Sequence, residues 1–303
     1  MRFTVTLPTD RVDRKEEFLS APAVSEMAAA MEAAGIDACH VTDHPFPPRE
    51  FVESGGHHSM DPMVTLAVAA SATTGLRLHT HVLIPAYRNP FVAAKAISTL
   101  AELSGGRVIL GVAAGYLEGE FAACGAGFER RGERLESTLE AMRAAWKGDP
   151  IEASGPGWEA LGNVMRPIPD EHIPVWIGGN SLSALRRAVR IGDGWCPFPV
   201  SQRTASVLRT RSMSTPDDLR SAIDMLRDQC EEAGRITLPI VCLTPFSHPH
   251  HRQVFDPAQL VEEALELEEI GVDWLSIRLP GEDRAAFLAN VHRFEQEVVA
   301  KLR

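Results

Sequence analysis

Strand-like and helix-like segments alternate along the whole chain, and this alternation restricts the fold more than any other feature. Four of the helical segments begin at an Asp-Pro, Asn-Pro or Thr-Pro step, in which the first residue can cap the helix. The expected strands are residues 2–7, 36–42, 76–84, 107–112, 174–177, 194–197, 237–243 and 272–277. The expected helices are residues 23–34, 62–73, 90–103, 132–146, 181–191, 216–233, 257–270 and 283–303.

Eight strand–helix units in strict order predict an α/β fold of the (β/α)8 TIM-barrel type. Parallel strands need helical crossovers, and eight such units are the number that closes a barrel. A doubly wound open sheet is the alternative, because it requires the strand count to differ by only one. Nothing in the composition marks a second domain, so we expect one domain over residues 1–303. Residues 147–173, rich in glycine and proline, are expected to form an irregular insertion.

Three long connections follow predicted strands, and their position indicates where a site is built. They are residues 44–60, 113–131 and 244–255. In a barrel, the loops that follow strands lie on the C-terminal face, where active sites are found. We therefore expect insertion loops and a functional site on that face.

Charge and composition exclude several classes of protein. The chain has 30 basic and 41 acidic residues, a net charge of −11, and no long basic stripe of the kind that binds nucleic acid. It lacks an apolar run of about 18 residues and an N-terminal signal pattern, so neither membrane association nor export is expected. We expect a cytoplasmic protein that acts on a small molecule. The five cysteines are widely spaced without a Cys-x-x-Cys motif, which argues against a disulfide framework or a cysteine-rich zinc site.

Asp43 and His44 stand at the end of the second predicted strand, where barrel enzymes place catalytic groups. Histidine titrates near neutral pH, and a neighbouring carboxylate can orient it, so the pair suits proton transfer. The structural alternative is that Asp43 only caps a turn at the start of the loop.

Two histidines face the same way on the third predicted strand. Strand alternation places His79 and His81 on one face, as a pair of metal ligands would require. No third ligand of comparable placement is evident. We therefore predict no metal site, and expect these side chains to line a pocket or to lie in the core.

Small residues follow the fourth and fifth predicted strands. Residues 105–115 and the segment Gly178-Gly179-Asn180-Ser181 let backbone N–H groups approach a flat or phosphorylated ligand, and the second segment also opens a helix. Glycine turns of this kind are also common for purely structural reasons.

Together, five stretches of the chain form a pattern that resembles a known family. The stretches are Thr42-Asp43-His44-Pro45-Phe46, Asp61-Pro62, Arg88-Asn89-Pro90, residues 103–115 and residues 174–195. They resemble the luciferase-like monooxygenase superfamily, and within it the F420-dependent oxidoreductase class. The resemblance covers roughly residues 30–200 in the family's order, and the last third matches only in outline. The family fold is a (β/α)8 barrel with insertions, in agreement with the strand count.

The resemblance implies a flavin or deazaflavin across the C-terminal face of the barrel. Asp43 would hydrogen-bond the ring system, and His44 would lie near its reacting face as the general acid or base. A non-proline cis peptide supports the ring in many relatives, and the matching place is about His81-Val82. Arg88 would help to anchor the pyrimidine edge or the loop. The phosphate end would meet the backbone of these residues: Ala113, Ala114, Gly115, Tyr116, Leu117, Gly178, Gly179 and Asn180.

The chain departs from the family pattern after the fourth strand. Tyr116 stands where some F420 enzymes have a glutamate, although Glu118 and Glu120 follow. The third strand has His79 where relatives commonly have glycine. Two arginine clusters could meet the anionic tail of F420 or could pair with nearby glutamates; they are Arg130, Arg131, Arg134 and Arg186, Arg187, Arg190.

The function implied is hydride transfer between coenzyme F420 and a small organic substrate. One alternative is a monooxygenase that uses reduced flavin mononucleotide (FMN). Two others are a metal-dependent barrel hydrolase using His44, His79 and His81, and a non-catalytic flavin-binding relative. The substrate, the direction of hydride transfer and the oligomeric state remain open, with a homodimer as one option.

Overall fold

A computed structural model of the protein describes residues 1–237, 239–248 and 255–303 and contains eight strands that correspond to the eight expected ones. Residue 238 of the expected strand 237–243, and residues 249–254 of the loop after it, lie outside the described residues. The strands are β1 (Arg2–Thr6), β2 (Ala38–Val41), β3 (Arg77–Leu83), β4 (Val108–Val112), β7 (Val175–Gly178), β8 (Gly194–Cys196), β9 (Ile240–Leu243) and β10 (Trp274–Ile277).

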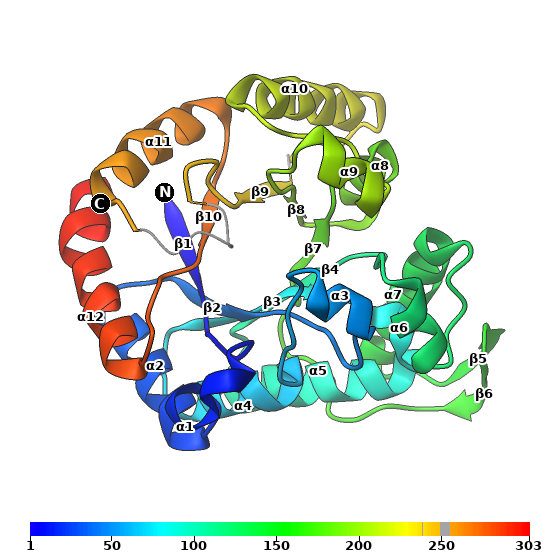
Figure 1. The fold of residues 1–303 in the computed structure, drawn as a ribbon. Helices are drawn as coiled ribbons and strands as arrows, with labels where there is room; N and C mark the ends of the chain where they lie inside the picture. Colours follow the sequence, from blue (N-terminus) through cyan, green and yellow to red (C-terminus); the bar gives the residue numbers. More distant parts are fainter. Residues whose placement is uncertain (238, 249–254) are drawn as a thin grey trace.

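These strands form a closed barrel, in which each strand pairs in parallel with its two neighbours. The order around the barrel is β1-β10-β9-β8-β7-β4-β3-β2, so the first and last strands pair with each other (Figure 1). The predicted TIM barrel is therefore confirmed, and the open-sheet alternative is wrong. All eight strands were expected at these places, within a few residues at their ends.

Helices follow the strands and surround the barrel (Figure 1). Asp61 and Asn89 each accept hydrogen bonds from two backbone N–H groups, as expected of residues that cap a helix before proline. None of the helices in the described ranges combines the length and the apolar character that a membrane span requires. The main helices are α2 (Ala21–Ala33), α4 (Pro62–Ser71), α5 (Pro90–Ser104), α7 (Arg131–Lys147), α8 (Leu182–Ile191), α10 (Pro216–Glu232), α11 (Pro257–Ile270) and α12 (Arg284–Phe294).

Short helices occupy the connections. Those after β2, β4 and β8 are α3 (Arg49–Glu53), α6 (Glu118–Ala123) and α9 (Gln202–Leu208), and η2 (Pro85–Tyr87) is a turn of 3-10 helix after β3. The others are η1 (Val12–Arg14) and α1 (Lys15–Phe18) near the N-terminus, and η3 (Glu295–Val299) and α13 (Ala300–Leu302) at the C-terminus.

The insertion expected to be irregular contains an antiparallel hairpin, so that expectation is wrong for much of its length. Strands β5 (Ile151–Gly155) and β6 (Trp158–Asn163) pair at the periphery of the barrel (Figure 1). Pro156 and Gly157 make the turn, and Gly157 adopts a φ of 82°, in the left-handed region that glycine tolerates. Trp158 packs on Phe91 of α5, with ring centroids 5.0 Å apart. The pattern was missed because most hairpin side chains are exposed and show no apolar alternation.

The barrel interior combines aromatic, thiol and imidazole groups. Trp176 lies against Trp274 and His79, with centroid separations of 5.2 and 4.9 Å. His40 is held by two threonine hydroxyls, 3.0 Å from Thr4 and 2.7 Å from Thr6. Burial lowers the pKa of His79 to about 4. His79 is therefore neutral at neutral pH.

Candidate active site

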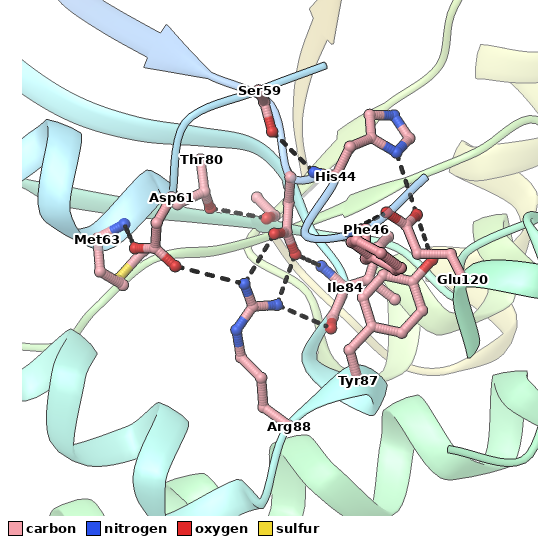
Figure 2. A network of polar contacts seen from close by, with 12 residues as sticks. His44, Phe46, Ser59, Asp61, Met63, Thr80, Ile84, Tyr87, Arg88 and Glu120 are labelled. Carbon is pink, nitrogen blue, oxygen red and sulfur yellow. Dashed lines mark hydrogen bonds and ion pairs between the residues drawn. The ribbon is translucent and has the colours of Figure 1, made fainter. Parts of the chain in front are cut away.

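His44 and Glu120 form a buried pair at the C-terminal end of the barrel. His44 Nδ1 lies 3.1 Å from Glu120 Oε2, and the Glu120 side chain is fully buried. Glu120 also accepts hydrogen bonds from the Phe46 backbone N–H at 3.1 Å and from the Tyr87 hydroxyl at 3.0 Å. Figure 2 shows these groups directed at the Glu120 carboxylate from separate segments. The carboxylate thus faces three groups that can each donate a hydrogen bond.

Aromatic packing holds Glu120 in this place. Phe121, the next residue on α6, packs on Tyr87 and on Phe128, with centroid separations of 4.7 and 5.4 Å. Burial raises the pKa of the Tyr87 hydroxyl well above its usual range, and the Glu120 charge adds to that effect. Tyr87 therefore stays protonated and can donate. The contacts of Glu120 fix the loop after β4 against the loop after β2. The His44 ring and the Glu120 carboxylate therefore keep a defined relative position, as an acid–base pair requires.

The backbone of His44 is positioned separately from its ring. The His44 N–H donates to Ser59 Oγ at 2.8 Å, which ties the two ends of the loop after β2 together (Figure 2). With Nδ1 turned toward Glu120, Nε2 is the ring nitrogen left for exchange with another molecule. The predicted acid–base role of His44 is compatible with this placement and stays a prediction.

Asp43 has both of its carboxylate oxygens engaged within the protein. The Arg88 guanidinium donates to the two oxygens at 2.7 Å each, and the Ile84 N–H donates to Oδ2 at 2.9 Å. Arg88 also lies 3.8 Å from Asp61 (Figure 2). Asp43 therefore fixes the segment after β3 to the end of β2. Its hydrogen bond to a cofactor ring stays a prediction, and Arg88 acts here as an anchor of the loop.

Three of the predicted cofactor-binding residues come together at the ends of β3, β4 and β7. The His81-Val82 peptide bond is cis, as predicted from the family resemblance. A Cβ atom placed on Gly178 would lie 3.2 Å from Val82 Cγ1 and 3.4 Å from the Ala113 side chain. The missing side chain of Gly178 thus leaves a shallow cradle between small side chains. Val82, Ala113 and Gly178 are each partly exposed, so a flat tricyclic ring can approach them here.

The glycine segment after β7 is used differently from the expectation. The Gly179 N–H donates to the Cys196 carbonyl at 3.1 Å, so it is committed to the barrel and not available to a phosphate. Asn180 bonds the backbone N–H and carbonyl of Phe198 through its side chain, at 3.0 and 2.8 Å. Ser181 caps α8 by accepting from the Ala184 N–H, as expected. The hydrogen bond from Gly179 to the neighbouring strand β8 determines the role of Gly179, and a sequence motif does not reveal a bond of this kind.

Arg131 anchors the segment 113–117 through a hydrogen bond to its backbone. Arg131 Nε donates to the Gly115 carbonyl at 2.9 Å, and its guanidinium lies 4.3 Å from the centre of the Phe128 ring. Ala114 and Leu117 are half-buried, and Tyr116 is exposed. These residues border the cradle from the β4 side.

Three of the six arginines considered for an anionic tail are paired with glutamates. Arg187 is buried and donates from Nε to Glu136 Oε1 at 2.8 Å, and Arg190 bonds the other oxygen of Glu136. Arg130 forms an ion pair with Glu133. The structure thus favours the pairing alternative for these residues.

Aromatic rings surround His44 at the mouth of the barrel. Its ring centroid lies 5.1 Å from that of Phe51, 4.9 Å from His57 and 6.3 Å from Tyr116. Partial burial and the Glu120 charge raise the pKa of Tyr116 to about 12, whereas burial and the neighbouring His44 lower the pKa of His57. Phe46 is 72% exposed beside them. The His57 and Tyr116 side chains at the rim of the site are therefore uncharged at neutral pH.

Sequence reasoning missed Glu120 and Tyr87 as members of the site. Glu120 was noted only as a carboxylate that follows Tyr116, and Tyr87 had no signal of its own. The sequence signal for this residue was the presence of a glutamate in the loop after β4. Glu120 lies four residues beyond Tyr116, the position at which some F420 enzymes have a glutamate. The short helix α6 turns that glutamate toward His44, and no spacing rule along the chain encodes this contact.

The fold and its loop-built mouth define a TIM-barrel protein with its site at the C-terminal ends of the strands. Residues 1–237 match the family described as luciferase-like monooxygenase, and the chain belongs to that family. It is a luciferase-like oxidoreductase by family.

Curated relatives and solved structures agree with this assignment. An F420-dependent glucose-6-phosphate dehydrogenase of Mycobacterium avium is 27% identical, over 92% of this chain and 93% of the relative. One from Nocardia farcinica is 34% identical, over 56% of this chain and 51% of the relative. The fold matches a monooxygenase from Streptomyces bottropensis, with a TM-score of 0.77, 17% identity and full coverage of both chains. It also matches an F420-dependent secondary alcohol dehydrogenase, with a TM-score of 0.73, 16% identity and coverage of 99% and 98%.

Proposed function

We propose that the protein is an oxidoreductase that transfers a hydride between coenzyme F420 and a small organic substrate. The His44–Glu120 pair is the observation that carries the proposal. A carboxylate bonded to one ring nitrogen fixes the tautomer and orientation of an imidazole, which leaves the other nitrogen to exchange a proton with substrate. Glu120 is the positioning residue, and His44 Nε2 is the proton donor or acceptor.

The cofactor would rest on the cradle of Val82, Ala113 and Gly178. When bound, F420 supplies the hydride transfer, and the protein supplies orientation and proton transfer. His44 gives a proton to, or takes one from, the oxygen of the substrate. The aromatic rim of Phe46, Phe51 and Tyr116 covers the apolar part of the substrate and excludes water.

Two sets of observations bear on the choice of cofactor. Curated relatives that align with most of this chain or with half of it are F420-dependent dehydrogenases, which supports F420. The pairing of Arg187 and Arg190 with Glu136 removes two cations that could have met the anionic tail of F420. That pairing favours the second candidate, an FMN-dependent monooxygenase on the same cradle.

A direct titration separates the two candidates. The apo-protein is titrated with F420 and with FMN under the same conditions, and binding is followed by cofactor fluorescence. We expect a lower dissociation constant for F420. Tighter binding of FMN would reverse the cofactor assignment, and binding of neither would remove the proposed function.

Gly178→Val is expected to weaken cofactor binding about 10- to 100-fold. The added side chain would fill the cradle against Val82 and Ala113, and overpacking of this kind costs about 1–3 kcal/mol. Gly75→Val is the matched control, because Gly75 is exposed before the start of β3, at the opposite end of the barrel. The measurement is the dissociation constant of each variant, with its melting temperature. Equal affinities in the two variants would place the cofactor elsewhere.

We also propose that two copies associate through α4 and α5. A groove between these helices is lined entirely by uncharged residues: Met63, Val64, Ala67, Val68, Ser71, Ala96, Thr99, Leu100 and Leu103. A chain with a net charge of −11 meets a second copy with the least repulsion at such a face. Leu103, which is 68% exposed, is the residue to change.

Leu103→Glu is expected to convert a dimer into a monomer, because it would bury a charge in the contact on both copies. Light scattering after size-exclusion chromatography gives the mass of each species. Val207→Glu is the control, since Val207 is 78% exposed on α9, away from the groove. A wild-type protein that runs as a monomer at all concentrations would contradict the proposal.

A further inference from the structure

Three metal-ligating side chains converge inside the barrel, away from the His44–Glu120 pair. His79 and His81 come from β3 and Cys196 from β8, and their potential ligand atoms all lie within 4.8 Å of one another. The two imidazole rings have centroids 4.9 Å apart. His79 and Cys196 are buried, and His81 is half-buried. This arrangement corrects the expectation that His79 and His81 have no third ligand.

The third ligand was missed because it comes from a strand far along the chain. In the barrel order, β4 and β7 separate β3 from β8, so Cys196 meets the histidines across the interior. Side chains that point inward from separated strands become neighbours only when the sheet closes. The hydrolase alternative had combined His79 and His81 with His44, but His44 is bonded to Glu120 instead.

The surroundings of His79 suit a side chain that binds a metal ion. Its Nδ1 lies 3.4 Å from the Thr4 hydroxyl, which orients the ring. Its Nε2 is buried without a hydrogen-bond partner of normal geometry among the described residues, and the Cys196 thiol is the group close enough to interact with the ring. A buried nitrogen in this state costs free energy unless something binds it. Only glycine fits at position 111, because a Cβ there would collide with the Thr80 carbonyl oxygen and would lie 2.8 Å from Nε2.

We propose that His79, His81 and Cys196 bind one divalent zinc-type cation. Two imidazoles and one thiolate are ligands that Zn²⁺ prefers, whereas Mg²⁺ and Ca²⁺ prefer oxygen. Three protein ligands leave a fourth tetrahedral position, as in catalytic zinc sites. The Thr4 hydroxyl is the outer partner that holds His79 in its ligating orientation.

Cys242 provides a matched control for Cys196. It lies on the adjacent strand β9, is also buried in the barrel, and its thiol is in hydrogen-bonding range of the Cys196 thiol. It does not belong to the three-residue group. Replacing either cysteine with alanine removes one buried thiol from nearly the same environment, and only one of the two replacements removes a proposed ligand.

The test measures metal directly and needs neither cofactor nor substrate. The full chain is purified under reducing conditions, and its metal content is measured by mass spectrometry; about one equivalent of Zn²⁺ is expected. After removal of that metal with a chelator, Co²⁺ is titrated in, and a thiolate-to-cobalt charge-transfer band is expected. Cys196→Ala should retain less than about a tenth of the metal and lose the band, and Cys242→Ala should keep both.

Two further variants keep the test decisive if Cys196→Ala folds poorly. His81→Gln changes the half-buried ligand and should also abolish the cobalt band. Thr4→Val keeps the shape of the side chain but loses the hydroxyl, and should weaken metal affinity about tenfold in competition with a chelating dye. Absence of both bound metal and cobalt band in the wild type would overturn the proposal. Equal metal content in Cys196→Ala and Cys242→Ala would overturn it as well.

Discussion

Glu120→Gln is expected to lower kcat by about 10²- to 10⁴-fold, with little change in cofactor affinity. Glutamine has nearly the same shape and can still accept from the Phe46 N–H. Its amide group, however, presents a donor where the carboxylate accepts from His44 Nδ1, so the imidazole would turn or change tautomer. The proton-exchanging nitrogen would then be misplaced. Steady-state kinetics give the measurement, with the cofactor found by titration and a small organic substrate that the wild-type protein turns over.

A double-mutant cycle distinguishes positioning of His44 from simple support of the fold. His44→Gln alone should cost as much as Glu120→Gln, and the double variant should cost little more than either one, because the second change acts only through His44. Tyr87→Phe is the control, since it removes another hydrogen bond to Glu120 but leaves the His44 contact. Additive losses would mean that Glu120 does not act through His44.

Most of the fold could be predicted because local signals and the global topology agree. Barrel strands are covered on both faces and therefore appear in the sequence as short apolar runs. Several helices begin with a capping residue directly before a proline, as at Asp61 and Asn89, and this pair marks the start of a helix in the sequence. The hairpin of β5 and β6 carried no such signal. Only Ala160 of its strands is buried, so the turn at Pro156 and Gly157 looked like a break in structure.

The site was predictable only where it lies within a motif. The cis bond at His81-Val82 lies where the family motif indicated, and His44 lies just after β2, as the strand pattern indicated. Glu120 and Cys196 reach their partners through the short helix α6 and through closure of the barrel, and neither contact is encoded by a spacing along the chain. Gly179 is the opposite case. Its glycine motif predicted a free backbone N–H, but this N–H forms a hydrogen bond within the barrel.

Arg88→Met is expected to destabilise the protein by about 3–5 kcal/mol, which corresponds to a fall in melting temperature on the order of 5–10 °C. The Asp43 side chain is only 1% exposed, and the substitution would leave its carboxylate buried without the two bonds from Arg88. Burial by itself acts to lower the pKa of Arg88, but the bond and charge of Asp43 raise it overall, so Arg88 keeps its positive charge beside Asp43. Thermal and chemical unfolding of the apo-protein provide the measurement.

The size of the loss should depend on burial and not on the removal of an arginine as such. Arg227→Met breaks a pair with Asp224 in which both side chains are well exposed, and such pairs contribute only about 0–1 kcal/mol. Asp43→Asn combined with Arg88→Met should recover part of the loss, because the neutral amide can still accept from the Ile84 N–H and leaves no buried charge. If Arg88→Met cost no more than Arg227→Met, Asp43 would have to be neutral or hydrated in the folded protein. The link between the ends of β2 and β3 would then rest on the Ile84 hydrogen bond alone.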